Sequence, residues 1–327
     1  MVQATIANAY PKIPRLKGEK NLRNALNRYE KGKIDARELE ETFVETITRV
    51  INYQFEAGMD IVTDGMIRWD DPLIRFTDGV RNLERGGLLR YFDNNIYYRR
   101  SIISGELGFE KPSTVNDFKL ASKTCDRPVR AILPGPYTFS GMVEDNYYFN
   151  SEKLITSLTE ILMQEVRSLK EAGCRIIQLE EPLLLYHPDD LDYASSWFNR
   201  ITEISDIEFW LCFYFGEFAK IADRIDAFNA DVIAVDVASH PNDFEALLNL
   251  NSDKRICFGL LDSRDIRMEK EEEVLSRMRS IRQSHKGKDF YISTSASLEF
   301  LPPDEAYDKL FLLGRLKSRF DAEEGDA

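Results

Sequence analysis

The sequence predicts an α/β fold, a (β/α)8 barrel, because short apolar runs alternate with helical patterns along the chain. Runs rich in Val, Ile and aromatic residues recur eight times in the 327 residues, at 5–10, 59–65, 129–135, 175–181, 209–215, 231–237, 255–262 and 290–297. Buried parallel strands have this composition. Eight strands that alternate with helices, in a chain of this length, favour a barrel.

Two segments have the spacing of long amphipathic helices. Residues 36–58 and 151–173 repeat apolar residues at intervals of three and four, and they end at Gly58 and Gly173. Glycine is a common helix stop. Ser151 is the expected N-cap of the second helix. Shorter helices are expected at 217–229, 242–250 and 269–284.

Residues 66–128 interrupt the alternation between the second and third predicted strands. Gly-Gly, Asp-Asn-Asn and Ser-Gly-Glu turn signals lie there between β-prone runs. Such signals are typical of hairpins. We therefore expect an inserted β-hairpin or small subdomain, within a single barrel domain that spans residues 1–327.

Charge and composition disfavour several classes of partner. The formal net charge is -13, with 56 acidic and 43 basic residues. Nucleic acids and anionic membranes reward basic surfaces, so neither is expected as the main partner. No apolar stretch approaches the roughly 20 residues of a membrane span, and the N-terminus does not resemble a signal peptide. A cytoplasmic protein is expected.

Metal-binding residues are sparse in the sequence. The four cysteines form no CxxC pair, and the three histidines are widely scattered. Zinc sites need three or four Cys, His or carboxylate ligands that converge. The pattern therefore predicts no metal on this chain.

Acidic and aromatic residues stand at the predicted strand ends, where the chemistry of such barrels gathers. Glu180 and Glu181 follow an apolar run; because side chains alternate along a strand, one should face the barrel mouth and the other the helix layer. Either a ligand site or loop-fixing bonds would account for these carboxylates. The candidate mouth residues are Tyr10, Asp64, Glu180, Glu181, Tyr214, Asp236, Asp262 and Arg264.

A basic stretch at 10–34 stands out in this acidic chain. Lys20 and Arg23 are three residues apart, so on a helix they would share a face. Near a helix start they would add charge to free N–H donors and favour an anion. An ordinary solvated helix face is the alternative.

Several motifs, in order along the chain, resemble the cobalamin-independent methionine synthase family. The family has two barrels in tandem, and the N-terminal one is a degenerate copy of the catalytic one. The chain resembles that N-terminal, non-zinc barrel as a free-standing protein. The similar segments are AYPKIP (9–14), KNLRNALNRYEKGKI (20–34), RPVRAILPGPYTF (127–139), IQLEEP (177–182), FYFGEF (213–218), FGLLDSRDIR (258–267) and ISTSASLEFLPPD (292–304).

The resemblance also implies departures from the catalytic barrel. Arg264 stands at the position of the family's catalytic His, and Glu180 at that of its amino-acid-binding Asp. The positions of the four zinc ligands carry Cys212, Tyr214, Asp236 and Ala296. Only Cys212 and Asp236 could bind zinc, so no cofactor is expected on this chain and zinc is expected on a partner.

The resemblance implies a component of a split methionine synthase, which transfers a methyl group from a 5-methyltetrahydrofolate-type donor to homocysteine. Its partner would be a zinc-containing protein of the C-terminal, catalytic type. The residues that match the family's contact with the donor's polyglutamate tail are Lys20, Asn21, Leu22 and Arg23. Two alternatives stay open. One is a stand-alone zinc-free enzyme, corrinoid-linked or uroporphyrinogen-decarboxylase-like, and the other is a non-catalytic scaffold subunit.

Overall fold

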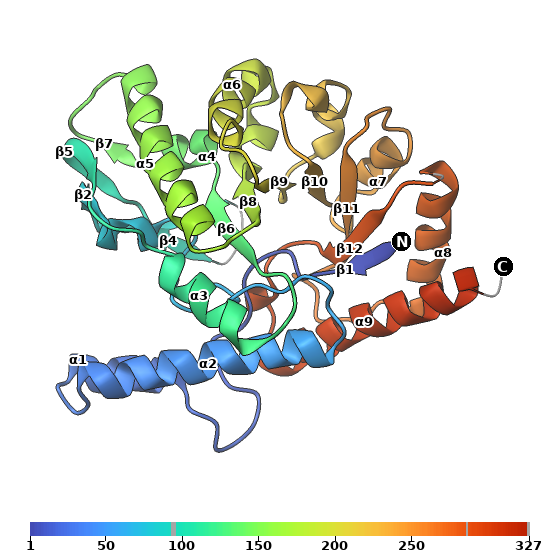
Figure 1. The fold of residues 1–327 in the computed structure, drawn as a ribbon, viewed down its shortest axis with the longest axis horizontal. Coiled ribbons are helices and arrows are strands. Elements are labelled where there is room, and N and C mark those ends of the chain that lie inside the picture. The colour runs from blue at the N-terminus through green and yellow to red at the C-terminus, as the bar shows by residue number, and fades with distance from the viewer. Residues whose placement is uncertain (93–95, 286, 326–327) are drawn as a thin grey trace.

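A parallel β-sheet curls into a barrel at the centre of the computed structural model, which describes residues 1–92, 96–285 and 287–325 (Figure 1). The strands lie in the order β1-β12-β11-β10-β9-β8-β6. Their bounds are β1 (Val2–Ala4), β6 (Arg130–Pro134), β8 (Ile176–Glu180), β9 (Glu208–Phe213), β10 (Val232–Asp236), β11 (Arg255–Leu261) and β12 (Phe290–Thr294).

Residues 59–63 close the barrel between β1 and β6. The Asp60 N–H donates to the Ala4 carbonyl at 2.9 Å, and Val62 forms a parallel bridge with Val129, beside β6. This segment takes the place of the second predicted strand. The predicted (β/α)8 barrel is thereby confirmed.

The first predicted strand, 5–10, is wrong in its bounds, because β1 ends at Ala4. Beyond Thr5 the backbone carbonyls bond to side chains in the barrel. Arg130 donates to the carbonyls of Ile6 and Ala7, and Gln178 donates to that of Ala7. These bonds replace a strand ladder and turn the chain across the top of the barrel.

Helices cover the outside of the sheet, and α1 and α2 extend along one side of the molecule (Figure 1). A capping box of Asp35 and Glu38 starts α2, whereas Asn150, not the expected Ser151, is the N-cap of α5. The helix bounds are α1 (Leu22–Glu30), α2 (Ala36–Glu56), α3 (Val115–Thr124), α4 (Pro136–Met142), α5 (Ser151–Glu171), α6 (Leu191–Thr202), α7 (Pro241–Leu248), α8 (Glu271–Ser284) and α9 (Pro303–Gly325).

The helix predicted at 217–229 is wrong. Two short 3-10 turns, η4 (Phe218–Lys220) and η5 (Ala222–Ala227), lie there instead. Asp243 of α7 accepts the Ala219 N–H at 2.8 Å, which holds the first turn against α7. Further 3-10 turns are η1 (Ile74–Asp78), η2 (Pro182–Tyr186), η3 (Pro188–Asp190) and η6 (Leu298–Phe300).

Antiparallel strands lie within residues 66–128. Strand β2 (Val80–Glu84) pairs with β5 (Ile102–Phe109), and β3 (Leu88–Arg90) pairs with β4 (Tyr97–Arg99). The two residues of β7 (Glu144–Asp145) join β5 in parallel. The Asp-Asn-Asn turn signal at 93–95 lies outside the described residues. We call the segment 80–109 the β2–β5 segment.

The core consists of the inner and outer faces of the barrel strands and the helix sides that cover them. Leu158, Leu162 and Val166 on α5 are buried, as are Leu310 and Leu313 on α9. Among the helices in the described ranges, none combines the length and the apolar character that crossing a bilayer requires.

Candidate functional site

A cavity of about 250 Å³ opens at the barrel mouth. Loops that follow the strands form one side of it, and the β2–β5 segment forms another. Four aromatic side chains line it: Trp69, Tyr91, Tyr214 and Phe300. The carboxyl ends of the strands meet here, which is where barrel enzymes place their ligands.

Glu180, at the end of β8, lies at the wall of this cavity with 3% of its surface exposed. Its carboxylate accepts hydrogen bonds from Asn8 Nδ2 at 2.9 Å, Gln178 Nε2 at 2.9 Å and the Tyr214 hydroxyl at 2.8 Å. Burial raises the pKa of Glu180, and these bonds oppose the rise. Three donors aimed at one carboxyl group favour its ionised form.

Tyr214 connects Glu180 to the β2–β5 segment. The Tyr91 hydroxyl lies 3.0 Å from that of Tyr214. Because the single hydroxyl hydrogen of Tyr214 goes to Glu180, Tyr91 is the donor in this pair. Burial raises the pKa of both phenols well above the usual value, so both stay protonated.

Arg130 of β6 is a buried cation in the barrel interior. Its guanidinium donates to the carbonyls of Ile6 and Ala7 and lies over the Trp210 ring, 4.4 Å from its centroid. Burial lowers the pKa of Arg130, and nearby acidic groups that include Glu180 oppose this shift. A cation close by makes a buried carboxylate tolerable.

Glu181 points away from the cavity, as the alternation along a strand predicts. It is fully buried and accepts the N–H groups of Tyr137 at 3.0 Å and Thr138 at 2.7 Å, at the start of α4. Burial raises the pKa of Glu181 to about 7 in spite of these bonds. Glu181 therefore fixes the loop that follows β6.

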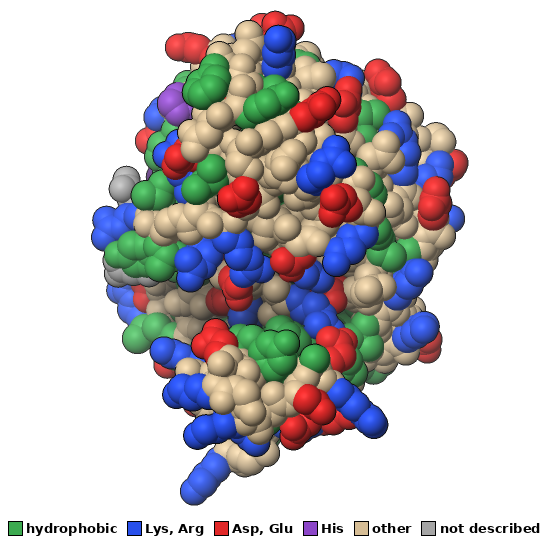
Figure 2. All heavy atoms as spheres, turned by 90° about the vertical axis from the view of Figure 1, so that its left-hand side faces the viewer, with side chains coloured by type: hydrophobic (Ala, Val, Ile, Leu, Met, Phe, Trp, Pro, Cys, Tyr) green, Lys and Arg blue, Asp and Glu red, His purple; other side chains and the backbone are tan. Residues whose placement is uncertain are grey.

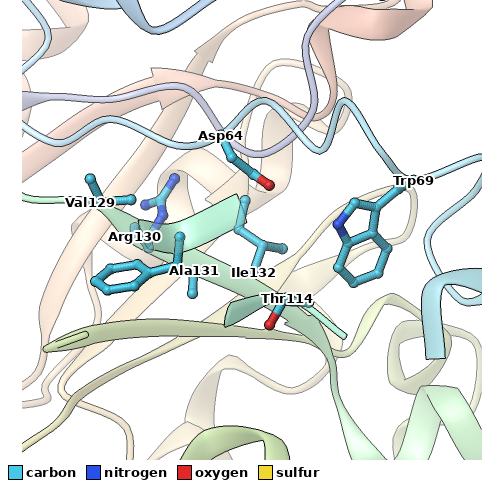
Figure 3. A pocket seen from close by; sticks show the side chains of 8 residues that line it. Asp64, Trp69, Thr114, Val129, Arg130, Ala131 and Ile132 are labelled. Atoms are coloured by element: carbon cyan, nitrogen blue, oxygen red, sulfur yellow. The ribbon is translucent and has the colours of Figure 1, made fainter. Parts of the chain in front are cut away.

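Asp64 lies in a separate, smaller hollow beside Trp69 (Figure 3). That hollow measures about 10 Å³, room for about one water. Asp64 accepts the Met66 N–H at 3.0 Å, and burial together with the nearby Asp117 raises its pKa to about 6. Figure 3 shows the indole nitrogen of Trp69 turned toward this hollow.

Asp236, Asp262 and Arg264 fix the loops that follow β10 and β11. Asp236 accepts the N–H groups of Ala238 and Ser239, and burial raises its pKa. Asp262 accepts the Arg264 N–H at 2.8 Å, and Arg264 donates to Ser239. These three residues are not among the described residues that line the cavity.

Tyr10 also lies away from the cavity lining. It is buried, and its ring faces Tyr53 of α2 at 6.2 Å between centroids. The strand it was expected to end stops at Ala4, so Tyr10 follows it by six residues on a loop.

The basic stretch does not form the predicted shared face. Asn21 is the N-cap of α1, so Lys20 precedes the helix, and Lys20 pairs with Glu45 of α2 at 2.6 Å. Arg23 lines a different hollow, of about 410 Å³, which it shares with Lys12. Leu22 is buried. The prediction that Lys20 and Arg23 share one helix face is therefore wrong.

The hollow of Lys12 and Arg23 adjoins the cavity, because Asp70 and Glu299 line both. Lys12 pairs with Glu299, whereas no ion pair of Arg23 occurs among the described residues. Figure 2 shows the side of the molecule that carries α1 and the β2–β5 segment. That side is hollowed between them, with basic and acidic side chains around the hollow.

Sequence reasoning missed Asn8, Gln178, Arg130 and Tyr91. Gln178 lies two residues before Glu180, so the alternation of a strand places both on one face and could have identified it. Asn8 and Arg130 are polar residues within apolar runs, which is a weaker signal. Nothing local distinguishes Tyr91, since only the tertiary structure brings it to Tyr214.

The four positions matched to zinc ligands do not form a fitting donor set. The Ala296 side chain has no atom that could bind a metal, and the Tyr214 phenol is hydrogen-bonded to Glu180 and Tyr91. Burial raises the pKa of the Cys212 thiol well above the usual value, whereas a zinc ligand must lose its proton. Over the described ranges, no group of three or more His, Cys, Asp or Glu is placed to hold a metal.

Comparison with known families gives a match over residues 9–314. The matched family model is described as the catalytic domain of cobalamin-independent synthase. The motifs predicted a resemblance to the N-terminal barrel of this family, whereas the matched model is that of its catalytic domain.

Relatives that the chain covers over nine tenths of their length include archaeal methionine synthases. The protein of Sulfurisphaera tokodaii is 26% identical over 311 residues, which cover 95% of this chain and 90% of the relative. That of Saccharolobus solfataricus is 25% identical over 313 residues, with 95% and 92% covered.

Solved structures show the same fold. A B12-independent methionine synthase from a Shewanella species, in complex with selenomethionine, superposes with a TM-score of 0.85, at 21% identity and 99% coverage of both chains. A putative vitamin-B12 independent methionine synthase from Listeria monocytogenes gives a TM-score of 0.75, at 18% identity and 98% coverage of both chains.

Proposed function

The chain belongs to the cobalamin-independent methionine synthase family, and we propose that it serves methyl transfer to homocysteine as a zinc-free component. In this proposal a separate chain carries the zinc. The methyl donor is of the 5-methyltetrahydrofolate type. The chain itself binds the donor and positions it against the partner.

The residues at the positions matched to zinc ligands, Tyr214 among them, are the observation on which this proposal rests. Zinc in this family would activate a thiol, which requires ligands that give up their protons. Here a protonated phenol and an alanine stand at two of the four matched positions. A thiolate nucleophile therefore needs a metal held by other residues, and a partner chain is the source we propose.

The hollow beside Arg23 supports a role in binding the donor. A polyglutamate tail carries several carboxylates, and a guanidinium binds carboxylates with two parallel hydrogen bonds. Arg23 is exposed at this hollow, with Lys12 nearby. Lys20 is already paired with Glu45, so we assign the tail contact to Arg23 and not to Lys20.

Reconstitution tests the proposal. The purified chain is mixed with a zinc-bearing homologue from the same organism, and methionine formed from homocysteine and methyltetrahydrofolate triglutamate is measured. We expect the mixture to exceed either chain alone, with zinc found on the other chain by metal analysis. Full activity of this chain alone would refute the split arrangement.

Arg23→Ala and Lys20→Ala form a matched pair for the tail contact, since each removes one cation near the start of α1. We expect Arg23→Ala to raise KM for the triglutamate donor by about tenfold, and to change KM for the monoglutamate donor less. Lys20→Ala should leave both values within about twofold. Equal effects of the two variants would contradict the assignment.

A second candidate is a zinc-free enzyme that acts alone. The cavity favours it, because Glu180 remains hydrogen-bonded and close to a space of about 250 Å³ that could hold a substrate. In this case Glu180 would act as a general acid or base. Turnover by the isolated chain that is lost in Glu180→Gln would favour this candidate over the split arrangement.

A further inference from the structure

The cavity beside Glu180 is lined by carboxylates and aromatic rings. Glu180 and Asp71 are buried in its wall, and Asp70 and Glu299 are exposed at its opening. Among the described residues, no Lys, Arg or His lines it. Carboxylates that share a cleft repel one another unless a cation accompanies them.

Three cations offset part of this charge from outside the cavity. Arg85 pairs with Asp70 at 3.3 Å, Lys12 pairs with Glu299, and Arg130 lies near Glu180 in the barrel interior. None of these three is among the residues that line the cavity. The oxygens of Glu180 and Asp71 already accept hydrogen bonds from the protein, so a ligand inside lies beside these carboxylates and not beside their counter-ions.

The hydroxyl and amide groups of the cavity wall donate to protein atoms. Asn8 and Tyr214 donate to Glu180, and Tyr91 donates to Tyr214. Ser297 donates to the Ala9 carbonyl at 3.3 Å. An anionic ligand needs hydrogen-bond donors, and these side chains already donate to the protein. A positively charged ligand is instead attracted by the carboxylates.

The remaining wall is apolar, with Met66, Trp69, Ile96 and Phe300 in it. A bare ammonium group is strongly hydrated, and it loses much hydration free energy on entering such a space. A centre that carries methyl groups is less hydrated, and aromatic rings attract it in addition. The walls therefore favour a methylated cation over a primary amine.

We propose that this cavity binds a small organic cation whose charged centre carries methyl groups, such as a trimethylammonium or dimethylsulfonium group. Glu180 faces the charge, and the aromatic side chains surround the methyl groups. This inference goes beyond the role in methyl transfer, because it concerns binding by the isolated chain.

Calorimetric titration of the full chain tests it with four probes. Choline carries the methylated cation, dimethylbutanol is its neutral isostere, ethanolamine is the primary amine, and L-homocysteine is the amino acid of the proposed reaction. We expect choline to bind at least about tenfold more tightly than each of the other three. Equal or tighter binding of any of them, or no saturable binding of choline, would overturn the proposal.

Two variants locate the binding. Glu180→Gln removes the charge and keeps the shape, and the exposed Glu160→Gln on α5 makes the same change away from the cavity. We expect the first to weaken choline binding about tenfold and the second to leave it unchanged. Phe300→Leu keeps the wall apolar but removes an aromatic ring. It should therefore reduce the ratio of choline affinity to dimethylbutanol affinity.

The two proposals can fail separately. If the wild-type chain does not bind choline but still supports methionine formation with its partner, the cation site alone is overturned. Unchanged choline binding in Glu180→Gln, with the variant shown to be folded by circular dichroism, would also overturn it.

Discussion

Tyr214→Phe is the most direct test of the hydrogen-bond network at the barrel mouth. The substitution removes one oxygen and keeps the ring. Glu180 keeps its bonds from Asn8 and Gln178 but loses the one from Tyr214, at 2.8 Å. The Tyr91 hydroxyl loses its acceptor at 3.0 Å.

The size of the effect follows from these two bonds. A hydrogen bond to a charged group contributes about 1.5–3 kcal/mol, and a neutral one contributes about 1 kcal/mol. The cavity lets water reach part of the site, which offsets some of the loss. We expect the free energy of unfolding to fall by about 2–3 kcal/mol at neutral pH.

The loss should depend on pH with a definite sign. The bond from Tyr214 lowers the pKa of Glu180, so it stabilises the ionised carboxylate. The cost of the substitution is therefore greatest where Glu180 is ionised, and it shrinks as the pH falls and the carboxyl group takes up a proton.

Urea denaturation of the variant and the wild type measures the difference, with Tyr147→Phe as the control. Tyr147 is 47% exposed, so its substitution should change stability by less than about 0.5 kcal/mol. A cycle with Tyr91→Phe should give a coupling of about 0.5–1 kcal/mol between the two tyrosines. A cost below about 0.5 kcal/mol for Tyr214→Phe, or no coupling, would refute the network.

Three further substitutions test a loop glycine and two carboxylates. Gly135→Ala should destabilise the fold by about 1–3 kcal/mol, because a Cβ there would lie 2.2 Å from Glu181 Cδ. A Cβ at Gly87 would meet open space, so Gly87→Ala should be neutral in the same denaturation assay. Equal effects of the two substitutions would contradict the contact. The pKa of Asp64 is raised from 3.8 to about 6, so the unfolded chain loses this proton first and stability falls as the pH rises between these values. Asp64→Asn should thus be more stable than the wild type near neutral pH, with little gain below pH about 4. The upper bound on this gain is about 3 kcal/mol, and solvent screening of the partly exposed Asp64 makes the gain smaller than that. The exposed Asp126→Asn is its control, and a gain that is the same at both pH values would contradict the shift. Glu165→Gln should lower the free energy of unfolding by about 2–3 kcal/mol, measured by thermal denaturation, because buried Glu165 accepts the N–H groups of Ser113 and Thr114 at the start of α3. The exposed Glu152→Gln should leave the free energy of unfolding unchanged, and a similar loss there would argue against this role.

Side-chain alternation explains why Glu180 and Glu181 were foreseen more fully than the basic stretch. A strand imposes opposite directions on neighbouring residues, so one carboxylate lines the cavity and the other takes two backbone N–H groups. The relation of Lys20 to Arg23 depended on where α1 begins. Asn21 caps that helix, and this one-residue detail separates the two cations.

The sequence by itself determined the barrel, because the local periodicity of apolar residues predicts strands and helices. Six of the eight apolar runs are strands of the parallel sheet. Residue identity also shows that, of the positions that the resemblance matches to zinc ligands, one carries an alanine, Ala296, and another carries a phenol, Tyr214. Only the tertiary structure decided that Tyr91 meets Tyr214, that Arg130 lies near Glu180, and that Asp70 and Glu299 stand between the cavity and the hollow of Arg23. Such contacts join residues far apart in the chain, and no local pattern encodes a distance that the packing of the whole barrel sets.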